Sequence, residues 1–369
     1  MGDAEIGEYD VVVAGGGPAG AAAAITLARA GLSALLIEGS RYEDQRLGET
    51  LPPAAAPLLA RLGLSEGLAD LRPIASHGNA SAWGDAELER DSFLFHAYGD
   101  GWHLDRRRFD EMASSTARDA GATVITGQLL TGCTHGAAGP WRLKLANGGI
   151  VSANALIDAT GRSAKLVRRL GARRRVLDHL VAVAVSFRGG STSSGHTLIE
   201  AQHDGWWYSA PLPGERLIVM FMTDADICRA NGLHQARRWA QKLATTRHTR
   251  GRVGHEHPLG APTVSAAVSH RLQRDDRTKR WTAAGDAALS VDPLSASGIV
   301  QALSGGELAA RAIAHGLLGR DQALVDYESW LDAQFANYLR ERQARYSLVT
   351  RWPNAPFWNR RRSLPACFR

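Results

Sequence analysis

The stretch YDVVVAGGGPAGAAAAITLARAGLSALLIEGS, residues 9–40, decides the fold. It opens with a short apolar run, DVVVAG, of the β-branched kind that a buried parallel strand requires. Glycines follow at once in a Gly-x-Gly-x-x-Gly pattern, and an alanine-rich helix is predicted to run from there to Gly31. A second apolar run ends at Glu38. Strand, glycines, helix, strand and acid occur in the order of a dinucleotide-binding unit.

Each glycine of the pattern has its own physical reason. Gly15 permits a tight turn, Gly17 lets backbone amides approach a pyrophosphate, and Gly20 lets the helix pack closely on the strand. The helix N-terminus directs partial positive charge at the phosphates. Glu38 is placed to accept the hydroxyls of an adenosine ribose, which favours FAD or NAD(H) over NADP(H). The predicted dinucleotide site comprises Gly15, Gly17, Pro18, Ala19, Gly20 and Glu38.

Two later elements indicate which dinucleotide is bound. GGIVSANALIDATGRSA (148–164) predicts a strand that ends in an acid, and RWTAAGDAALSVDPLSASGIVQALSGGELAARAI (280–313) predicts a strand, a glycine–acid turn, a loop and a long helix. A nicotinamide dehydrogenase does not need this second glycine–acid element, whereas the ribityl chain of a flavin needs an acceptor such as Asp286. A helix N-terminus at Gly298 suits the negative charge of a reduced isoalloxazine. The sequence therefore predicts FAD, with further contacts from Asp158, Gly161, Gly285, Asp286, Gly298 and Ile299.

Composition and charge narrow the class of protein. The 369 residues are 44% hydrophobic and 22% charged, as in ordinary globular proteins of more than one domain. The net charge of +6 comes mostly from arginine, and we interpret it as a solvated basic face, because no aromatic–basic module indicates nucleic acid. No apolar run is long enough to cross a bilayer, so no membrane partner is expected.

Cysteines and the first residues indicate the compartment. Cys133, Cys228 and Cys367 are widely spaced and form neither a disulfide framework nor a metal pattern. The opening MGDAEIGEYD lacks the basic and apolar regions of a secretory signal. We therefore expect a cytoplasmic protein without a metal site.

The predicted fold class is α/β, with an inserted substrate domain. A Rossmann-like FAD-binding domain is expected to form from separated pieces, together with a β-sheet substrate domain and a C-terminal helical tail. A hairpin is expected at Pro213–Glu215. The tail RWPNAPFWNRRRSLPACFR (351–369) either grips a partner protein or packs as a helix cap. The boundaries are 1–75, 99–165 and 275–320 for the FAD-binding domain, 76–98 and 166–274 for the substrate domain, and 321–369 for the C-terminal segment.

These elements resemble the group A flavoprotein monooxygenases of the p-hydroxybenzoate hydroxylase type over nearly the whole chain. The resemblance implies a glutathione-reductase type of FAD-binding domain. In that family the segment after the second strand contacts the flavin, and RYEDQRLGETLPP (41–53) occupies its place here. The resemblance thereby adds Gly48, Glu49 and Thr50 to the expected FAD site.

Two further matches to the family concern the flavin. HLDRRRFDEMASSTARDAG (103–121) resembles the helix whose leading Asp-Arg faces FAD. The resemblance implies that Asp105 is the N-cap of this helix and that Arg106 neutralises pyrophosphate charge. Pro293, in the motif DPLS, resembles the family's loop at the flavin edge.

GETLPP also resembles the flavin-dependent halogenase branch, and two further motifs test that likeness. Halogenases carry a lysine that relays hypohalous acid and a Trp-x-Trp-x-Ile-Pro motif. PIASHGNASAWG (73–84), which occupies the neighbourhood of that lysine, contains none. GWWYSAPLP (205–213) is a degraded form of the second motif. Chlorination is therefore not expected.

The chain resembles most of all the small flavoprotein maturases of tryptophylquinone enzymes, of the lysine ε-oxidase, glycine oxidase and quinohemoprotein amine dehydrogenase types. The shared motifs are GETLPP, SAWG, GWHLDR, IDATGR, DGWWYSAPLP, GDAALSVDPLSASGI and RWPNAPFW. Those maturases oxygenate a tryptophan of a partner protein to make cysteine tryptophylquinone. The resemblance implies an FAD-dependent monooxygenase that hydroxylates an aromatic ring through a flavin C4a-hydroperoxide, with a precursor protein and O2 as partners.

Three alternatives to that function stay open. The chain could be a hydroxylase of a small or carrier-bound aromatic metabolite, a residual halogenase, or a non-catalytic flavoprotein chaperone. The sequence contains no second nucleotide-binding fingerprint, so the reductant is expected to be NAD(P)H that binds transiently or a partner reductase.

A monooxygenase also needs a chamber that excludes water from the oxygenated flavin. Three aromatic-rich segments, SAWG, FLFHAYGDGW and GWWYSAPLP, are predicted to build it, although the same aromatics could instead fill a sheet core. No general acid or base is assigned. The pocket candidates are Trp83, His96, Tyr98, Trp206, Tyr208 and Pro293.

Overall fold

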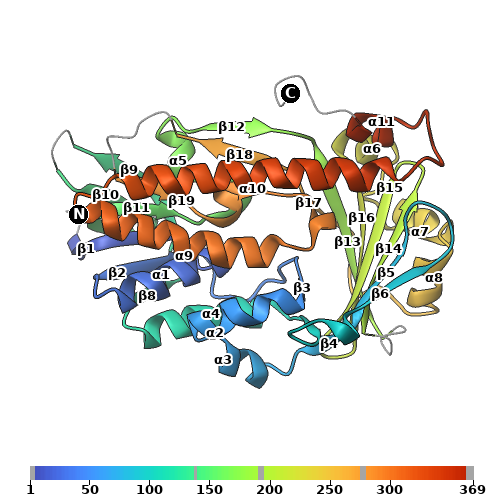
Figure 1. The fold of residues 1–369 in the computed structure, drawn as a ribbon, viewed down its shortest axis with the longest axis horizontal. Helices are drawn as coiled ribbons and strands as arrows, with labels where there is room; N and C mark the ends of the chain where they lie inside the picture. Colours follow the sequence, from blue (N-terminus) through green and yellow to red (C-terminus); the bar gives the residue numbers. More distant parts are fainter. Residues whose placement is uncertain (1–4, 137–138, 190–194, 275–279, 363–369) are drawn as a thin grey trace.

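The computed structural model describes residues 5–136, 139–189, 195–274 and 280–362. Two large β-sheets lie at opposite ends of the molecule, and helices pack on both (Figure 1). The fold class is α/β, as the sequence predicts.

The first large sheet carries the glycine-rich turn. Its strands run in the order β8-β2-β1-β11-β10-β9, and β19 also pairs with β11. Pairing is parallel except where β10 joins β11 and β9. The strands are β1 Glu5–Ala14, β2 Ala34–Glu38, β8 Thr123–Thr126, β9 Leu130–His135, β10 Trp141–Leu145, β11 Ile150–Asp158 and β19 Trp281–Ala283.

Two helices pack together against this sheet. Helix α1 (Pro18–Arg29) follows the glycine-rich turn, and α9 (Gly298–Leu317) is the long helix expected near Gly298. Their close approach depends on Gly306, because a Cβ at this position would lie 2.1 Å from the carbonyl oxygen of Ala19. The apolar side chains of β1 are buried on both faces, as a central parallel strand requires.

The second large sheet has the strand order β17-β13-β16-β15-β14-β5-β6. The aromatic side chains of Trp207 and Phe221 point to one face, where helices α6 (Ala225–Ala230), α7 (Ala236–Ala244) and α8 (His248–Val253) cover it. The turn between β15 and β16 confirms the hairpin expected at Pro213–Glu215. The strands are β5 Gly78–Ala82, β6 Glu89–Ser92, β13 Leu180–Arg188, β14 His196–Gln202, β15 Gly205–Leu212, β16 Arg216–Asp224 and β17 Thr263–Ala266.

Two three-stranded sheets and several short helices complete the connections. Helix α4 (Arg106–Asp119) begins at Asp105, whose side chain accepts hydrogen bonds from the amides of Arg107 and Arg108, so the expected N-cap is confirmed. The small sheets contain β3 Thr50–Leu51, β7 Gly101–His103 and β4 Ile74–Ser76, and β12 Arg173–Val176, β18 His270–Gln273 and β20 Leu289–Ser290. The remaining helices are α2 Ala56–Leu62, α3 Ser65–Asp70, α5 Lys165–Arg169, η1 Pro53–Ala55, η2 Phe93–Phe95, η3 Gly161–Ser163, η4 Gly285–Ala287 and η5 Pro293–Ser295.

The C-terminal segment joins the two ends of the molecule. Helix α10 (Gln322–Ser347) runs from the first sheet toward the second, and α11 (Pro356–Arg362) packs there (Figure 1). Phe357 and Trp358 are fully buried, and Arg361 forms a 2.6 Å ion pair with Asp224. Of the two interpretations of the tail, the packing interpretation is confirmed for α11. Residues 363–369 lie outside the described residues. Within the described chain, no helix combines the length and apolarity that crossing a membrane demands.

Candidate active site

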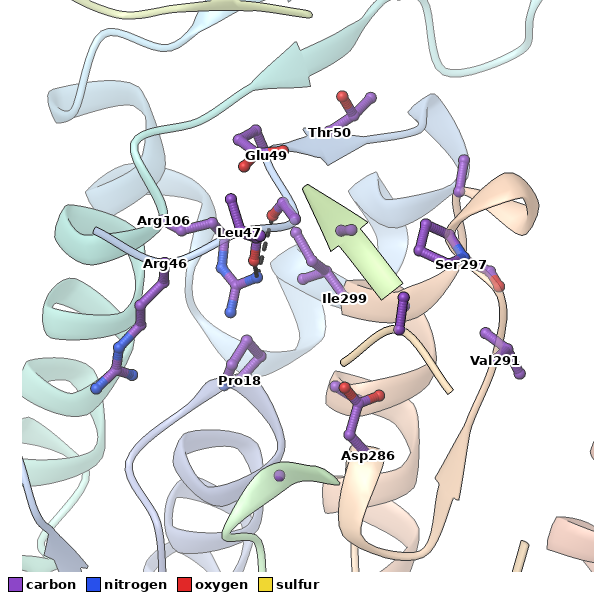
Figure 2. Close-up of a pocket in the computed structure, with 18 of the residues that line it drawn as sticks. Pro18, Arg46, Leu47, Glu49, Thr50, Arg106, Asp286, Val291, Ser297 and Ile299 are labelled. Carbon is purple, nitrogen blue, oxygen red and sulfur yellow. Dashed lines mark hydrogen bonds between the residues drawn. The ribbon is translucent and has the colours of Figure 1, made fainter. Parts of the chain in front are cut away.

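A cavity of about 1900 Å³ lies between the glycine-rich turn and the second large sheet. Its walls include the end of β1, the starts of α1 and α9, the segment 43–54, and strands β5, β14, β15 and β16. Figure 2 shows labelled side chains from the start of α1, from 46–50, from Arg106 at the start of α4 and from 286–299 around one shared space. The cavity therefore brings together most of the residues that the sequence proposed for FAD.

The glycines at one end of the cavity differ in what they touch. A Cβ on Gly15, whose φ is +103°, would lie 2.4 Å from the carbonyl oxygen of Ala159, and one on Gly20 would lie 1.8 Å from that of Gly15. Gly17 has no heavy atom within 4 Å of such a Cβ, and it lines the cavity. Among the described residues, no side chain caps the amides at the start of α1. The turn thus leaves open space and free amides where a phosphate would bind.

Glu38 accepts hydrogen bonds that keep it ionised. Its Oε2 accepts from the amide of Gly16 at 2.6 Å, and Oε1 accepts from the hydroxyl of Ser40 at 2.6 Å and from Arg46 at 2.8 Å. Burial acts to raise the pKa of Glu38, but the hydrogen bonds from Ser40 and Gly16 and the charge of Arg46 outweigh it and hold the pKa below its usual value. The anion lies at the cavity wall, where a ribose hydroxyl could donate to it.

Arg106 holds the loop that precedes β3. Its Nη1 donates to the carbonyl oxygens of Leu47 at 2.8 Å and Gly48 at 3.0 Å, as Figure 2 shows. Its Nε lies 3.1 Å from the buried carboxylate of Asp110, which also pairs with Arg46 at 2.8 Å. The charge of Arg106 is therefore shared with Asp110, and its role toward a pyrophosphate stays a prediction.

Glu49 is a buried carboxyl group without a partner. Its side chain lines the cavity and is 2% exposed, and neither carboxylate oxygen has a hydrogen-bond partner among the described residues. Burial raises the pKa of Glu49 to about 7, although nearby backbone amides and Arg106 act in the opposite direction. Buried polar atoms are almost always hydrogen-bonded, so this carboxyl group indicates a ligand donor inside the cavity.

Thr50 connects the same loop to the second sheet. Its hydroxyl lies 2.8 Å from that of Tyr208 and 3.1 Å from Nδ1 of His103. Burial lowers the pKa of His103 to about 4, so its imidazole is neutral near pH 7. Burial raises the pKa of Tyr208 above its usual value, which keeps its hydroxyl protonated. This neutral chain fixes the position of Thr50 and of Tyr208 at the cavity wall.

The far end of the cavity is formed by the later elements. Asp286 pairs with Arg162 at 3.2 Å, and Arg162 also donates to the hydroxyl of Ser290 at 2.8 Å. Helix α9 begins at Gly298, and the side chain of its N-cap residue Ser297 makes no capping hydrogen bond. A Cβ at Gly298 would meet no described atom within 4 Å. The predicted residues that line the cavity are Gly15, Gly17, Pro18, Ala19, Glu38, Gly48, Glu49, Thr50, Arg106, Gly161, Asp286, Pro293, Gly298 and Ile299.

Three predicted residues support the cavity from behind. Gly20 packs against Gly15, and a Cβ on Gly285, whose φ is +58°, would lie only 2.7 Å from the Cβ of Ala19. Asp158 is fully buried and accepts hydrogen bonds from the amide and hydroxyl of Thr160 at 2.9 and 2.6 Å. These residues shape the turns but do not line the cavity.

The aromatic pocket candidates divide into two groups. Trp83, Tyr208 and Pro293 line the cavity, whereas His96, Tyr98 and Trp206 do not. His96 and Tyr98 are exposed in the segment after β6.

Trp206 is buried in a core next to the cavity wall. Tyr346 covers it, and its Nε1 donates to the hydroxyl of Tyr346 at 3.0 Å. The expectation that His96, Tyr98 and Trp206 face the pocket is therefore corrected.

Other cavity residues were missed by sequence reasoning. Arg46 and Arg162 line the cavity and lie inside two motifs that predicted FAD contacts, RYEDQRLGETLPP and IDATGR. Nothing in the sequence pattern distinguished them from other arginines. Asn79 and Ser81 on β5 also line the cavity, and short polar residues in a strand give no local signal.

The residues of the cavity fit FAD. Gly17 and Gly298 leave open space at the two helix N-termini, Glu38 and Asp286 offer acceptors near each, and the unpartnered Glu49 lies in the same cavity. A dinucleotide with a ribityl chain requires this spread of donors and acceptors. In contrast, no group of metal-ligating side chains was found within the parts of the chain that the structure covers.

Comparisons with known proteins agree with this assignment. Residues 86–367 match the tryptophan halogenase family model, and residues 10–44 match the model of an FAD-binding domain. A putative FAD-dependent oxidoreductase, LodB, of Marinomonas mediterranea is 32% identical over 97% of this chain and 98% of its own length. A menaquinone reductase of Mycobacterium tuberculosis is 29% identical over 82% of this chain and 76% of its own.

Solved structures show the same fold. The myxobacterial chondrochloren halogenase CndH superposes with a TM-score of 0.89 and 22% identity over 97% of this chain and 87% of its own. The peptidyl tryptophan dihydroxylase QhpG is essential for tryptophylquinone cofactor biogenesis. It superposes with a TM-score of 0.74 and 23% identity over 97% of this chain and 79% of its own. Fold and cavity thus define an FAD-dependent oxidoreductase whose cofactor is FAD. The chain belongs to the tryptophan halogenase family.

Proposed function

We propose that this FAD-dependent oxidoreductase is a monooxygenase that hydroxylates the ring of a tryptophan side chain in a precursor protein. The product would be an intermediate in the biogenesis of cysteine tryptophylquinone. The likeness to LodB and to the peptidyl tryptophan dihydroxylase QhpG supports this proposal. Cys133 and Cys228 are free thiols, which supports the expected cytoplasmic location.

The observation that best supports the proposal is the volume of the cavity together with the aromatic and thioether side chains in its wall. Ligand pockets usually have volumes of up to about 1000 Å³, and this cavity is nearly twice as large. Beyond the FAD contacts it reaches Trp83, Tyr208, Met220 and Met222 of the second sheet. That region offers an aromatic and thioether wall beside the flavin end, where an indole ring can pack.

Bound FAD supplies the electron transfer and the activation of O2. The amides at the start of α9 would stabilise negative charge on the reduced ring, since no side chain of the described chain caps them. Met220 and Met222 would exclude water from the reacting end. Glu49, with a pKa of about 7, can hold or release a proton at its carboxyl oxygens near neutrality, as a general acid or base must.

The halogenase alternative lacks a lysine in the expected place. Trp83 and its neighbours in 73–84 contribute to the cavity wall without a lysine among them. A hydroxylase of a carrier-bound metabolite is compatible with the family, and the experiment below separates it from the protein-directed reaction.

The test uses the FAD-loaded protein, NAD(P)H, ¹⁸O2 and the unmodified precursor of a lysine ε-oxidase type enzyme. We expect the labelled oxygen on a tryptophan of the precursor, measured by intact mass and peptide mapping. Label that appears only on a free or carrier-bound aromatic compound supports the metabolite alternative, and a gain of chlorine supports halogenation. Precursor that matures equally with a variant unable to bind FAD supports the chaperone alternative.

The source of electrons needs its own measurement. Mixing the FAD-loaded protein with NADH or NADPH under anaerobic conditions in a stopped-flow spectrometer is expected to bleach the flavin absorbance. If neither nucleotide bleaches it, the electrons come from a partner reductase.

A further inference from the structure

Strand β6 is an unpaired edge of the second sheet at the rim of the cavity. It pairs with β5 on one side, and no other strand of the described chain lies on its other side. All four of its residues are exposed. The free amide and carbonyl groups of such an edge are a template on which an extended peptide can add as a further strand.

The rim of the cavity along this edge is acidic. Asp85, Glu87, Glu89 and Asp91 occupy every second position, and all four line the cavity. Glu87 pairs with Arg247 at 2.8 Å, whereas Glu89 and Asp91 have no ion-pair partner among the residues that the structure describes. The chain as a whole carries a net charge of +6, so this rim is opposite in sign to the rest of the molecule. Such a rim favours a basic partner.

An apolar tip follows the acidic edge directly. Leu94 is 75%, Phe95 95% and Tyr98 52% exposed, while Phe93 lines the cavity. The tip is held in place, because the amide of Phe93 donates to the carbonyl oxygen of His77 at 2.9 Å. Large aromatic side chains that stay exposed beside a binding cavity are typical of protein–protein contact sites.

We propose that β6 and this tip dock an extended, basic segment of the protein substrate, which pairs with β6 and places an aromatic side chain in the cavity. The proposal rests on the proposed function. The buried Glu49, whose carboxylate oxygens have no hydrogen-bond partner among the described residues, lines the same cavity that this edge borders. The acidic residues disfavour an anionic membrane surface, and a two-fold contact with a second copy would place acid against acid.

Two labelled peptides test the docking surface on the FAD-loaded protein. Both carry a central tryptophan, and alternate residues are lysine in one and glutamate in the other. We expect the lysine peptide to bind at least about tenfold more tightly by fluorescence anisotropy, and E89K/D91K to reverse this preference. L94S/F95S should weaken binding of the lysine peptide by about tenfold. N-methylation of alternate backbone amides in the lysine peptide should abolish binding, because it blocks strand pairing.

Matched controls come from exposed residues that do not line the cavity. E66K changes charge on α3, and L318S removes an exposed leucine after α9, so neither should alter peptide binding. Equal affinity for the two peptides, or equal binding by L94S/F95S and the wild-type protein, overturns the proposal. The proposal is also overturned if the wild-type protein binds phosphatidylglycerol vesicles and L94S/F95S does not. It is overturned as well if the wild-type protein forms a concentration-dependent dimer and L94S/F95S does not.

Turnover of the precursor separates this proposal from the proposed function. L94S/F95S is expected to raise KM for the precursor about tenfold, with unchanged FAD affinity and unchanged anaerobic reduction by NAD(P)H. If neither the wild-type protein nor any variant oxygenates the precursor, the proposed function is wrong. The difference in affinity between the lysine and glutamate peptides then still tests the docking surface. If wild type and L94S/F95S oxygenate it with equal KM, the docking surface is wrong and the function stands.

Discussion

The hydroxyl group of Tyr346 donates a 2.6 Å hydrogen bond to Oδ2 of Asp292, and it accepts one from Nε1 of Trp206 at 3.0 Å. All three side chains are buried. Asp292 also accepts a hydrogen bond from the amide of Leu294 and thereby caps η5, which contains the cavity residue Pro293. Helix α10 thus connects the second sheet to the loop expected at the flavin edge.

Replacing Tyr346 with phenylalanine should weaken this connection. Y346F leaves the Oδ2 atom of Asp292 without its short hydrogen bond and Trp206 without an acceptor, so we expect a loss of about 1–3 kcal/mol in the free energy of unfolding. The affinity for FAD should fall too, because the loop is less restrained. Denaturant unfolding and a fluorescence titration with FAD measure the two effects.

The control for this variant is W239F, which removes a buried hydrogen bond from Trp239 to the carbonyl oxygen of Val183 behind the second sheet. W239F should lose stability without losing FAD affinity. Equal FAD affinity in Y346F and the wild-type protein would show that the loop does not depend on Tyr346.

Adding one methyl group at Gly17 should impair FAD binding but not folding. The backbone at Gly17 is extended, and a Cβ there meets no heavy atom within 4 Å, so the protein alone accommodates G17A. The methyl group enters the space expected for a phosphate, and we predict at least about a tenfold loss of FAD affinity. Isothermal titration measures it.

Gly132 provides the matched control, because its Cβ would also meet nothing within 4 Å and it lies outside the cavity. G132A should leave FAD affinity unchanged. G20A differs from both, since its Cβ would lie 1.8 Å from the carbonyl oxygen of Gly15, and it should destabilise the fold. Similar FAD affinities for G17A and G132A would contradict the assignment of the phosphate site.

Glu49 should make the stability of the FAD-free protein depend on pH. Burial raises its pKa from the usual value of 4.5 to about 7, so between these values the folded state holds a proton that the unfolded state has released. Stability is therefore lost as the pH rises through this range. E49Q stays neutral, and we expect it to be more stable than the wild-type protein at about pH 8, by roughly 3 kcal/mol, and equal to it at about pH 4.

Urea unfolding of the FAD-free protein at the two pH values gives this difference. E66Q, on the exposed surface of α3, is the control and should show no pH-dependent gain. A gain for E49Q that is the same at both pH values would mean that the carboxyl group is not the titrating group.

The ion pair between Arg361 and Asp224 should contribute more to the free energy of unfolding than the ion pair between Arg360 and Asp224. Arg361 is buried and lies 2.6 Å from Asp224, while the side chain of Arg360 is half exposed and lies 2.8 Å from the same carboxylate. R361M is expected to cost about 3 kcal/mol of unfolding free energy, and R360M about 1 kcal/mol or less. A double-mutant cycle with D224N measures the coupling, and equal costs for the two arginines would contradict the buried role of Arg361.

Local pattern was sufficient to predict the unit formed by β1, α1 and β2. The apolar run, the glycines and the terminal Glu38 are contiguous, and each is required by a contact within the unit, such as the approach of Gly20 to Gly15. The later turn at Gly285 and the start of α9 were predictable for the same reason. The α/β class follows from these elements.

The aromatic wall was predicted only in part. Trp206 and Tyr208 are two residues apart on β15 and share a face, as strand geometry requires. Only Tyr208 reaches the cavity, because Trp206 is covered by Tyr346, which lies 140 positions away in sequence. No periodicity encodes that contact. Arg46 and Arg162 were missed for a different reason, since 43 lysines and arginines offer many equivalent candidates.

The dependence of Asp292 on α10 has a consequence for biosynthesis. The ribosome releases β1 and α1 first, and these segments can assemble early around the glycine-rich turn. The loop that carries Pro293 gains its hydrogen bonds to Tyr338 and Tyr346 only after α10 has left the exit tunnel. We therefore expect a nascent chain that ends before α10 to hold its coenzyme loosely, and firm capture of the coenzyme to follow translation of the helix.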